Sequence, residues 1–552
     1  MNLCIQCEKP TVLYDQSTAK TYTYDSSDNI ISVTERNGQT TTFTYDPMNR
    51  ITLAEYADGS FTTYQYDAAG RIATISDTIS GVISYTYTDS GCSTGTCGGT
   101  AVDRLASETT PQGTINYSYD AIGRRTIMTV AGQPAVNYSY DANSRLTSID
   151  TIISGATATF SLGYDTIGRR TTLTLPNGVT TNYSYDNASR LSNLQHVDSS
   201  NNVLESLSYT YDADGNRLSM NRQNVTTVPL PNLVTSATYN DANQMLIFTP
   251  QTGSAKNITY DLNGNMISVT NSCGTTTYTC DARNRLVGIN GYNSDCSALT
   301  ASFKYDALGR RFEKTTNNRT IQYLYDRMDI AEEIESGAVG ASYIRTLNID
   351  EPLARIKADG TLRYYQRDAL GSVIALTDST EAIKTQYVYD PFGSTTVIGE
   401  GSDNPFQYTG RESDGTGLIY YRARYYSPEI QRFISEDPIG FEGGINFFAY
   451  VRNNSLNRND PNGEIGLPEI AFGIGTLAWI WYTYYDSRHP EDPTQPDHSR
   501  QDSVIQTNPP PAICHGSNNR SRNPEHSLPE LDYPEPAEQI ELPQIYRTIG
   551  VK

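Results

Sequence analysis

The sequence predicts an all-β protein made of many short strands and turns. Tyrosine is the unusual residue, with 41 Tyr against 13 Phe and 2 Trp in 552 residues. Tyr suits a strand face that packs on its ring while keeping a polar tip. Charged residues make up 19% of the chain, below the usual ~25%. A Tyr-Asp pair also recurs along most of the chain, and together these observations favour strands over helices.

A single repeated unit organises residues 22–363. It consists of an aromatic residue, any residue, Tyr, Asp, two variable residues, Gly or Asn, Arg and often Leu or Ile. The Tyr of the pair falls at 24, 45 and 66, a spacing of 21 residues. Units at a fixed spacing stack on one another and bury a continuous face. Further copies stand at 43–51, 64–72, 117–125, 138–146, 162–170, 183–191, 209–218 and 303–311.

Each unit predicts two strands and two turns. Tyr117 and Tyr119 alternate with a serine, so both side chains face one side of a strand. Asp120 ends that strand and can bond its own backbone, and Gly123 can adopt a positive φ. The repeated Arg, here Arg124, is expected to pair with a repeated Asp and to cover Tyr rings by cation–π contact. We therefore predict a structural role for the repeat residues and assign them no catalysis.

The net charge of −21 constrains the partners of the chain. An acidic chain repels phosphate backbones and anionic membrane surfaces, so nucleic-acid binding by the repeats is not expected. The sequence predicts no cofactor and no metal site. A Cys-x-x-Cys pair at Cys4 and Cys7 has no matching second pair, so a zinc site there is disfavoured.

The cysteines do not follow the repeat, so no disulfide framework is predicted. Cys92 and Cys97 flank a short insertion and are the one pair for which a local bridge stays open. The remaining interpretation is ordinary thiols in loops. The eight positions are Cys4, Cys7, Cys92, Cys97, Cys273, Cys280, Cys296 and Cys514.

After about residue 360 the repeat passes into a denser segment. This segment contains YYQRDALGSVIALTDS (364–379), YVYDPFGSTT (387–396) and a long aromatic-rich stretch (404–463). Residues 20–463 resemble the Rhs family, and 364–463 resembles its repeat-associated core domain. The family includes bacterial Rhs polymorphic toxins, the C components of insecticidal toxin complexes and, more distantly, the teneurin shell.

The resemblance implies a β-sheet wound as a spiral into a hollow shell that is plugged by the core domain. It also implies that the shell cuts itself at the end of the core and releases the variable polypeptide that follows. The expected domains are a lead-in at 1–21, the repeat shell at 22–363, the core at 364–463 and a tail at 464–552. The short shell leaves closure and encapsulation open.

Two Asp-Pro-x-Gly motifs in the core segment carry the predicted chemistry, at Asp437 and Asp460. Two carboxyls brought together cannot both ionise cheaply, so one can activate water while the other donates a proton. The Gly443-Gly444 pair and the Asn453-Asn454 pair allow the chain to fold back and bring them together. Asp-Pro-x-Gly is also a common turn, and that structural interpretation stays open for each copy.

The resemblance assigns self-cleavage to Asp437 and Asp460, assisted by Arg424, with the cut between Glu464 and Ile465. An arginine near two carboxyls would bias which one is ionised or polarise the attacked carbonyl. The family usually has an apolar residue after the last Gly, whereas this chain has Glu464. A charge there would disturb the acid pair, so slow or absent cleavage is the alternative.

The tail changes composition. Residues 470–485 are uncharged and apolar-rich, but their length falls short of the ~20 residues that span a bilayer. We therefore favour packing or threading inside the shell over membrane insertion. The Pro-rich and polar remainder predicts an irregular or disordered end.

Three functions are compatible with the sequence. The first is a shell that encloses and releases its own C-terminal effector, with an immunity protein or a secretion-machinery component as partner. The second is an adhesion scaffold that binds carbohydrate or another cell-surface ligand without catalysis, and the third is a truncated orphan cassette. The N terminus shows no secretory signal, so a cytoplasmic chain that reaches the surface or exterior by a non-classical route is expected.

Overall fold

A computed structural model describes residues 19–88, 104–225, 230–464 and 467–468. This part of the chain is all-β, as predicted, and its strands form two long antiparallel sheets of 18 and 16 strands and two small ones. The first sheet contains β1 (Thr21–Tyr24), β2 (Ile30–Thr34), β3 (Thr40–Tyr45), β4 (Ile51–Glu55), β5 (Phe61–Tyr66), β6 (Ile72–Asp77), β7 (Gly81–Tyr87), β8 (Leu105–Thr110), β9 (Gly113–Tyr119), β10 (Arg125–Val130), β11 (Val136–Tyr140), β12 (Leu146–Ile153), β13 (Ala156–Tyr164), β14 (Arg170–Thr174), β15 (Thr180–Tyr185), β16 (Leu191–Val197), β17 (Val203–Tyr211) and β18 (Arg217–Arg222).

The second sheet continues the same pattern after residue 230. It contains β19 (Val234–Tyr239), β20 (Met245–Pro250), β21 (Lys256–Tyr260), β22 (Met266–Asn271), β23 (Gly274–Cys280), β24 (Leu286–Tyr292), β25 (Ala298–Tyr305), β26 (Arg311–Thr316), β27 (Arg319–Asp326), β28 (Asp329–Glu335), β29 (Ala338–Arg345), β30 (Pro352–Lys357), β31 (Leu362–Arg367), β32 (Val373–Thr377), β33 (Ile383–Tyr389) and β34 (Thr395–Gly399). Residues 364–399 of the predicted core therefore extend this sheet, while the domain limits themselves stay predictions.

The last elements are short. The third sheet is β35 (Glu412–Ser413), β36 (Ile419–Tyr421), β37 (Arg424–Ser427) and β38 (Arg432–Phe433), and the fourth is β39 (Arg458–Asn459) with β40 (Leu467–Pro468). Single turns of 3-10 helix stand at η1 (Tyr408–Gly410), η2 (Gly440–Glu442) and η3 (Val451–Asn453).

Each repeat is the predicted hairpin, and its turn follows the predicted chemistry. The carboxylate of Asp120 accepts hydrogen bonds from the backbone N–H groups of Ile122 and Arg124. Gly123 has a φ of 84° and its N–H bonds the carbonyl of Asp120. In most units the strand register shifts at the Tyr of the Tyr-Asp pair, as at Tyr45 and Tyr140. This bulge leads the strand into the tight turn.

A recurring Asp-Arg-Tyr contact joins each unit to the next. Arg124 pairs with Asp120 of its own turn at 2.6 Å, and its guanidinium lies 4.7 Å from the ring centre of Tyr140. The Tyr140 hydroxyl donates to the carbonyl of Arg125. This confirms the predicted structural role of the repeated Arg. The same ion pair and ring contact recur at Arg50, Arg71, Arg145, Arg169, Arg190, Arg285 and Arg310.

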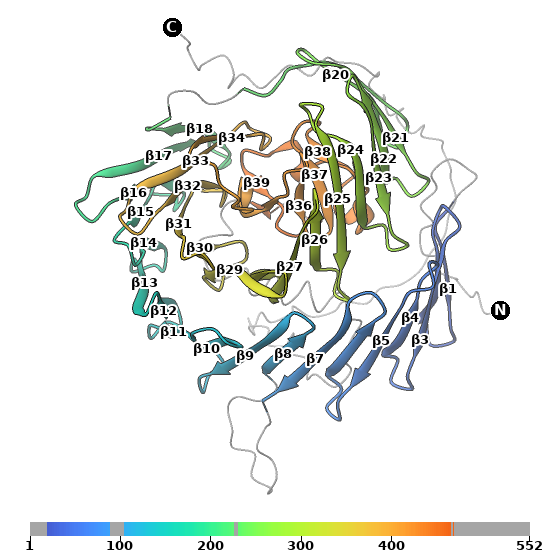
Figure 1. The fold of residues 1–552 in the computed structure, drawn as a ribbon, viewed down its shortest axis with the longest axis horizontal. Helices are drawn as coiled ribbons and strands as arrows, with labels where there is room; N and C mark the ends of the chain where they lie inside the picture. The colour runs from blue at the N-terminus through green and yellow to red at the C-terminus, as the bar shows by residue number, and fades with distance from the viewer. Residues whose placement is uncertain (1–18, 89–103, 226–229, 465–466, 469–552) are drawn as a thin grey trace, which may run out of the picture. The chain divides into compact units, whose positions relative to one another are not determined.

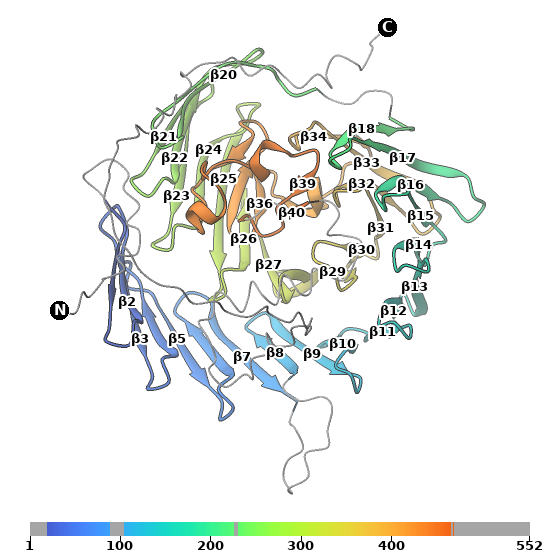
Figure 2. The same ribbon diagram turned by 180° about the vertical axis from the view of Figure 1, so that it is seen from behind.

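The second sheet lies beside the first. Residues that contact each other across the two sheets are separated by a nearly constant number of positions in the sequence. Buried and part-buried ion pairs join the two sheets across sequence separations of 206, 202, 201 and 181 residues, in the pairs Asp77–Arg283, Glu108–Arg310, Arg125–Asp326 and Arg170–Glu351. Both views show β8 and β9 next to β27 (Figures 1 and 2). A shared apolar cluster that includes Ile115, Phe160, Leu324 and Leu353 fills the seam. The chain thus winds past itself, as a spiral requires.

The third sheet packs against one face of the second. Tyr420 and Tyr425 join a cluster with Phe303 and Tyr305, next to β25 and β26 (Figure 2). Arg311 is fully buried there and pairs with Glu412 and Asp414. A buried cation needs such partners to offset its lost hydration. These contacts fix the end of the core segment relative to the wall.

The prediction of loop thiols is wrong for two cysteines. Cys273 and Cys296 form a disulfide with a Cα–Cα distance of 5.0 Å, whereas Cys280 is free. The two lie in successive turns at one edge of the sheet, after β22 and after β24. Their separation of 23 residues is close to one repeat, which is why the fold makes them neighbours. Cys4, Cys7, Cys92, Cys97 and Cys514 lie outside the described residues, as do 470–485.

Among the residues that the structure describes, no helix is long and apolar enough to cross a membrane.

Replacing both Cys273 and Cys296 by Ser is expected to loosen this part of the wall. Closing a loop of this size contributes about 3 kcal/mol through chain entropy. Hydrogen exchange of the β22–β25 amides should therefore accelerate in the double variant, with β9–β13 as the internal reference. Alkylation of Cys273 in the native, unreduced wild-type chain would contradict the disulfide.

Candidate active site

The site is built where β37, the turn at 437–444 and the turn at 460–464 meet. Arg424 stands at the start of β37 and is only 3% exposed. Its Nη2 lies 2.8 Å from Oδ2 of Asp437 and 3.6 Å from Oδ2 of Asp460. Because both oxygens contact the same nitrogen, the two carboxyls are neighbours. The structure thus brings together the three predicted residues, which are far apart in the sequence.

Each aspartate also closes its own turn. Oδ1 of Asp437 accepts the N–H of Ile439 at 3.1 Å, and Oδ1 of Asp460 accepts the N–H of Glu464 at 3.0 Å. Each carboxyl thus uses one oxygen for the turn and turns the other toward Arg424. Closing a turn is therefore compatible with pairing through Arg424, and the catalytic role of the two acids stays a prediction.

A third Asp-Pro-x-Gly motif, at 390–393, shows what the turn alone does. Oδ1 of Asp390 accepts the N–H groups of Phe392 and Ser394 at 2.8 and 2.9 Å. Asp390 stands between β33 and β34 in the wall. Among the described contacts, no arginine pairs with its carboxyl. The Asp-Pro-x-Gly motif therefore forms a turn by itself. Asp437 and Asp460 differ from Asp390 in that each also contacts an arginine from another segment.

The charged groups of the site are buried, which costs them much of their hydration. Arg424 stacks on Phe433 with a distance of 3.7 Å to the ring centre, and its Nη1 donates to the carbonyl of Phe447 at 2.8 Å. Asp460 and Glu464 are 1% and 5% exposed. Burial lowers the pKa of Arg424 against the opposing effect of Asp437, Asp460 and Glu464. A charge placed here has little water to stabilise it.

Asp437 is poised to carry a proton. Burial raises its pKa to about 6, and the neighbouring Asp460 adds to that rise, against the opposing pull of Arg424. A raised pKa of this kind is what a proton-donating carboxyl beside a second carboxyl needs.

Gly443 allows the Asp437 carboxyl to approach the backbone of Glu464. A Cβ at residue 443 would lie 2.3 Å from Oδ2 of Asp437 and 3.2 Å from the carbonyl oxygen of Glu464. Only glycine leaves this space open. The sequence predicted the Gly443-Gly444 pair as a point of chain return but not this close approach, which no sequence pattern reveals.

The predicted cleavage point is only partly described. Glu464 lies at the site with its N–H on Asp460, whereas Ile465 lies outside the described residues. Arg424 donates through Nε to the carbonyl of Gly463. Gly463 has a φ of 74°, and a Cβ there would lie 2.2 Å from the carbonyl oxygen of Tyr421. The backbone before the expected cut is thus tightly fixed.

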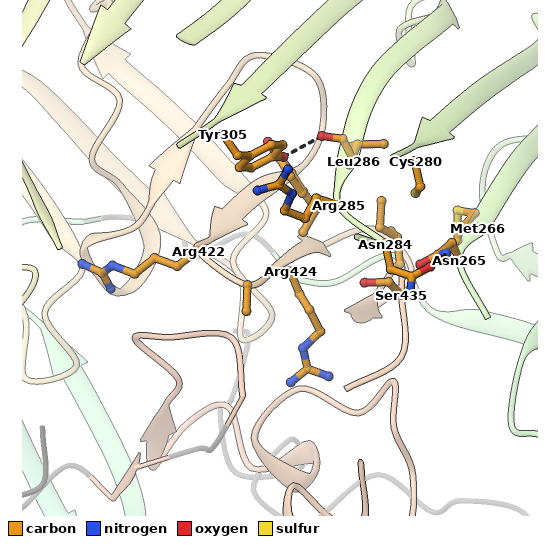
Figure 3. A pocket seen from close by; sticks show the side chains of 13 residues that line it. Asn265, Met266, Cys280, Asn284, Arg285, Leu286, Tyr305, Arg422, Arg424 and Ser435 are labelled. Atoms are coloured by element: carbon orange, nitrogen blue, oxygen red, sulfur yellow. Dashed lines mark hydrogen bonds between the residues drawn. The ribbon is translucent and has the colours of Figure 1, made fainter. Parts of the chain in front are cut away.

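A small pocket is lined by Asn265, Tyr305, Arg422, Arg424 and neighbouring residues, and its lining includes neither Asp437 nor Asp460. In Figure 3 the guanidinium group of Arg424 points away from Tyr305 and Asn284. The pocket is therefore separate from the paired acids. No group of three or more His, Cys, Asp or Glu side chains suited to a metal occurs in the part of the chain that the structure describes.

The sequence matches two known families. The family described as Teneurin YD-shell matches residues 159–458, more than half of the chain, and RHS Repeat matches residues 24–60. Among curated proteins, the tRNA3(Ser)-specific nuclease WapA of Bacillus spizizenii is 33% identical over 287 residues, covering 50% of this chain and 11% of that protein. Toxin subunit YenC1 of Yersinia entomophaga is 31% identical over 201 residues, covering 32% of this chain and 20% of that protein.

Solved structures share the fold. The crystal structure of TcdB2-TccC3-Cdc42 aligns with a TM-score of 0.56 at 20% identity, covering 81% of this chain and 28% of that one. The Photorhabdus luminescens Tc holotoxin pore aligns with a TM-score of 0.54 at 20% identity, covering 82% and 29%. The chain spans less than a third of each of these proteins. The family match over residues 159–458, more than half of the chain, shows that this chain belongs to the YD-shell family, and the solved structures share its fold.

Proposed function

We propose that the chain is the shell part of a delivered toxin and that it cuts its own backbone between Glu464 and Ile465. The cut would separate the tail from the shell as an effector segment. The names of the relatives, a tRNA nuclease and a toxin subunit, support an effector role for the whole protein. The pairing of TcdB2 with TccC3 in the related structures supports a protein partner.

The disulfide supports delivery outside the producing cell. Disulfides form and persist mainly in oxidising surroundings such as the cell exterior. The Cys273–Cys296 bond therefore favours a chain whose wall works outside the cytoplasm, by a route that we do not assign.

A single observation carries the proposed cleavage. Asp437 and Asp460 share Arg424 beside the backbone of Glu464. In the proposed reaction, ionised Asp460 takes a proton from a water molecule, which attacks the carbonyl carbon of Glu464. Protonated Asp437 donates to the carbonyl oxygen, and both groups lie near the position that a Cβ of residue 443 would occupy. Collapse of the intermediate breaks the C–N bond. The proton taken from water passes from Asp460 to the nitrogen of Ile465, and one hydroxyl proton of the intermediate returns to Asp437.

Asp437→Asn and Asp460→Asn are each expected to leave the chain intact, because each removes one half of the acid pair. Wild type should give two fragments whose masses place the cut after Glu464. Asp390→Asn is the matched control, because it alters the same motif in a plain turn and should be cut like wild type. Intact-mass spectrometry of the wild type and the three variants measures whether each chain is cut. An uncut wild-type chain would remove the proposal and favour a scaffold without catalysis, such as the adhesion or orphan alternatives.

The pH dependence of cleavage follows from Asp437. Its pKa of about 6 lies above the ordinary value, so the proton-donating form dominates below pH 6 and is lost as the pH rises. The cleavage rate should therefore fall about tenfold for each pH unit above 7. Refolding the chain from urea into buffers between pH 6 and pH 9 and following fragment appearance measures this. A rate that increases over that range would contradict the assignment of Asp437 as the acid.

Gly443→Ala should slow cleavage about 100-fold while keeping the wall folded. The added methyl group would displace the Asp437 carboxyl or the Glu464 carbonyl, and a shift of ~1 Å costs roughly 100-fold in rate. Gly401→Ala is the control, since a Cβ there meets nothing within 4 Å. Fragment yield and the thermal unfolding midpoint separate a loss of activity from a loss of fold. Wild-type cleavage by Gly443→Ala would show that this close approach has no role.

A further inference from the structure

Arg422 lies two residues before Arg424, in the tight turn between β36 and β37. It has a φ of 55°, a strained conformation for a non-glycine residue. Its side chain is buried, at 8% exposed. The sequence shows the pattern Arg-Ala-Arg at 422–424, but nothing in the pattern says what the two arginines contact.

The guanidinium of Arg422 reaches both the wall and the cleavage segment. Nη1 donates to the carbonyl of Pro461, inside the second Asp-Pro-x-Gly motif. Nη2 lies 2.7 Å from Oδ1 of Asp350 and 3.1 Å from Oδ1 of Asp329. Asp329 begins β28, and Asp350 stands in the turn between β29 and β30. One side chain therefore connects two turns of the wall to the residue after Asp460.

Three successive residues hold three successive carbonyls, an arrangement that we call the carbonyl clamp. Arg422 donates through its side chain to Pro461, Ala423 donates its N–H to Asn462 at 3.1 Å, and Arg424 donates through Nε to Gly463. The clamp fixes the register of residues 461–463 against the hairpin. The next N–H along the chain, that of Glu464, is the one that bonds Asp460.

Two features show that Arg422 differs from Arg424. The described contacts of Arg422 are with Asp329, Asp350, Met328 and Pro461, and none of them is with the carboxyls of Asp437 or Asp460. Its two carboxylate partners also stand on the wall, Asp329 at the start of β28 and Asp350 in the turn between β29 and β30. Arg422 thus pairs with two carboxylates of the wall, while its Nη1, which also bonds Asp350, donates to one backbone carbonyl.

We infer that Arg422 is a positioning residue for the backbone cleavage, holding the Pro461 carbonyl to the wall so that Glu464 sits against the acid pair. This inference rests on the proposed self-cleavage. It adds a condition to that function, because residues 461–464 take their place only when the turns that carry Asp329 and Asp350 are themselves folded. Cleavage is thereby coupled to completion of this part of the wall.

Arg422→Gln is expected to slow cleavage about 100-fold, because the segment before the cut loses its fixed position by ~1 Å. The pH at which the rate changes should stay that of wild type, since Asp437, Asp460 and Arg424 are untouched. Arg411→Gln is the matched control: Arg411 pairs with the same Asp350 but, in the described contacts, makes none with 460–464. It should be cut within about threefold of wild type. Fragment formation after refolding from urea measures all three chains.

A second measurement does not depend on cleavage. In the Asp437→Asn background, adding Arg422→Gln should speed hydrogen exchange at the N–H groups of Ala423 and Glu464, whereas adding Arg411→Gln should not. Unchanged exchange at both N–H groups would overturn the positioning role even if the rate fell. Arg422→Lys, which keeps the charge but not the forked donor, should be cut at an intermediate rate and serves if the Gln variant does not fold.

The outcomes separate the two proposals. An intact wild-type chain would overturn both the self-cleavage and the role of Arg422. A cut wild type with equally fast cutting in Arg422→Gln, or in a folded Arg422→Lys, would overturn only the role of Arg422. Equal slowing in Arg411→Gln would show that the buried charge balance, not the hold on Pro461, sets the rate, and would also overturn it.

Discussion

A buried guanidinium group that lacks partners is among the most costly features a fold can contain, and Arg424 organises the end of the core for this reason. It is almost fully enclosed and stacked on an aromatic ring, so its charge must be met by nearby acceptors. Two carboxylates and two backbone carbonyls meet it, from the segments at 437, 447, 460 and 463. These segments have little regular structure of their own, and the arginine gives them a common point of attachment.

The wall supplies the rigid base for that arrangement. Its repeated Asp-Arg-Tyr contact is mostly half-exposed and local, and it sets the spacing of neighbouring hairpins. At the seam between the two sheets the ion pairs become buried and join residues about 200 positions apart. At the candidate site the same two residue types meet, but Arg424 and the two aspartates come from different segments. Together they lie around the backbone near residue 464. A structural contact of the repeat and a candidate catalytic one therefore differ mainly in burial and in which segments they join.

The sequence predicts contacts within about one repeat well and contacts between distant segments poorly. The hairpin unit, the Asp turn, the positive φ at Gly123 and the Arg-Tyr stacking all follow from residues within about one repeat, and the structure confirms them. The grouping of Arg424 with Asp437 and Asp460 followed from the family resemblance rather than from spacing. Spacing does not distinguish Asp437 from Asp390, which opens the same motif without an arginine partner among the described contacts. The ion pairs at the seam, the space beside Gly443 and the hold of Arg422 on Pro461 arise from three-dimensional proximity that no local pattern encodes.

The central claim is that the acid pair hydrolyses one bond, the bond after Glu464. Cell-free synthesis of the chain in water enriched in ¹⁸O tests it most directly, because hydrolysis places one oxygen atom of water in the newly formed carboxyl group. The account predicts an N-terminal fragment that ends at Glu464 and carries a single ¹⁸O at its new α-carboxyl, absent from Asp437→Asn. A fragment with no label, one that ends elsewhere, or the same labelled fragment from Asp437→Asn would contradict it.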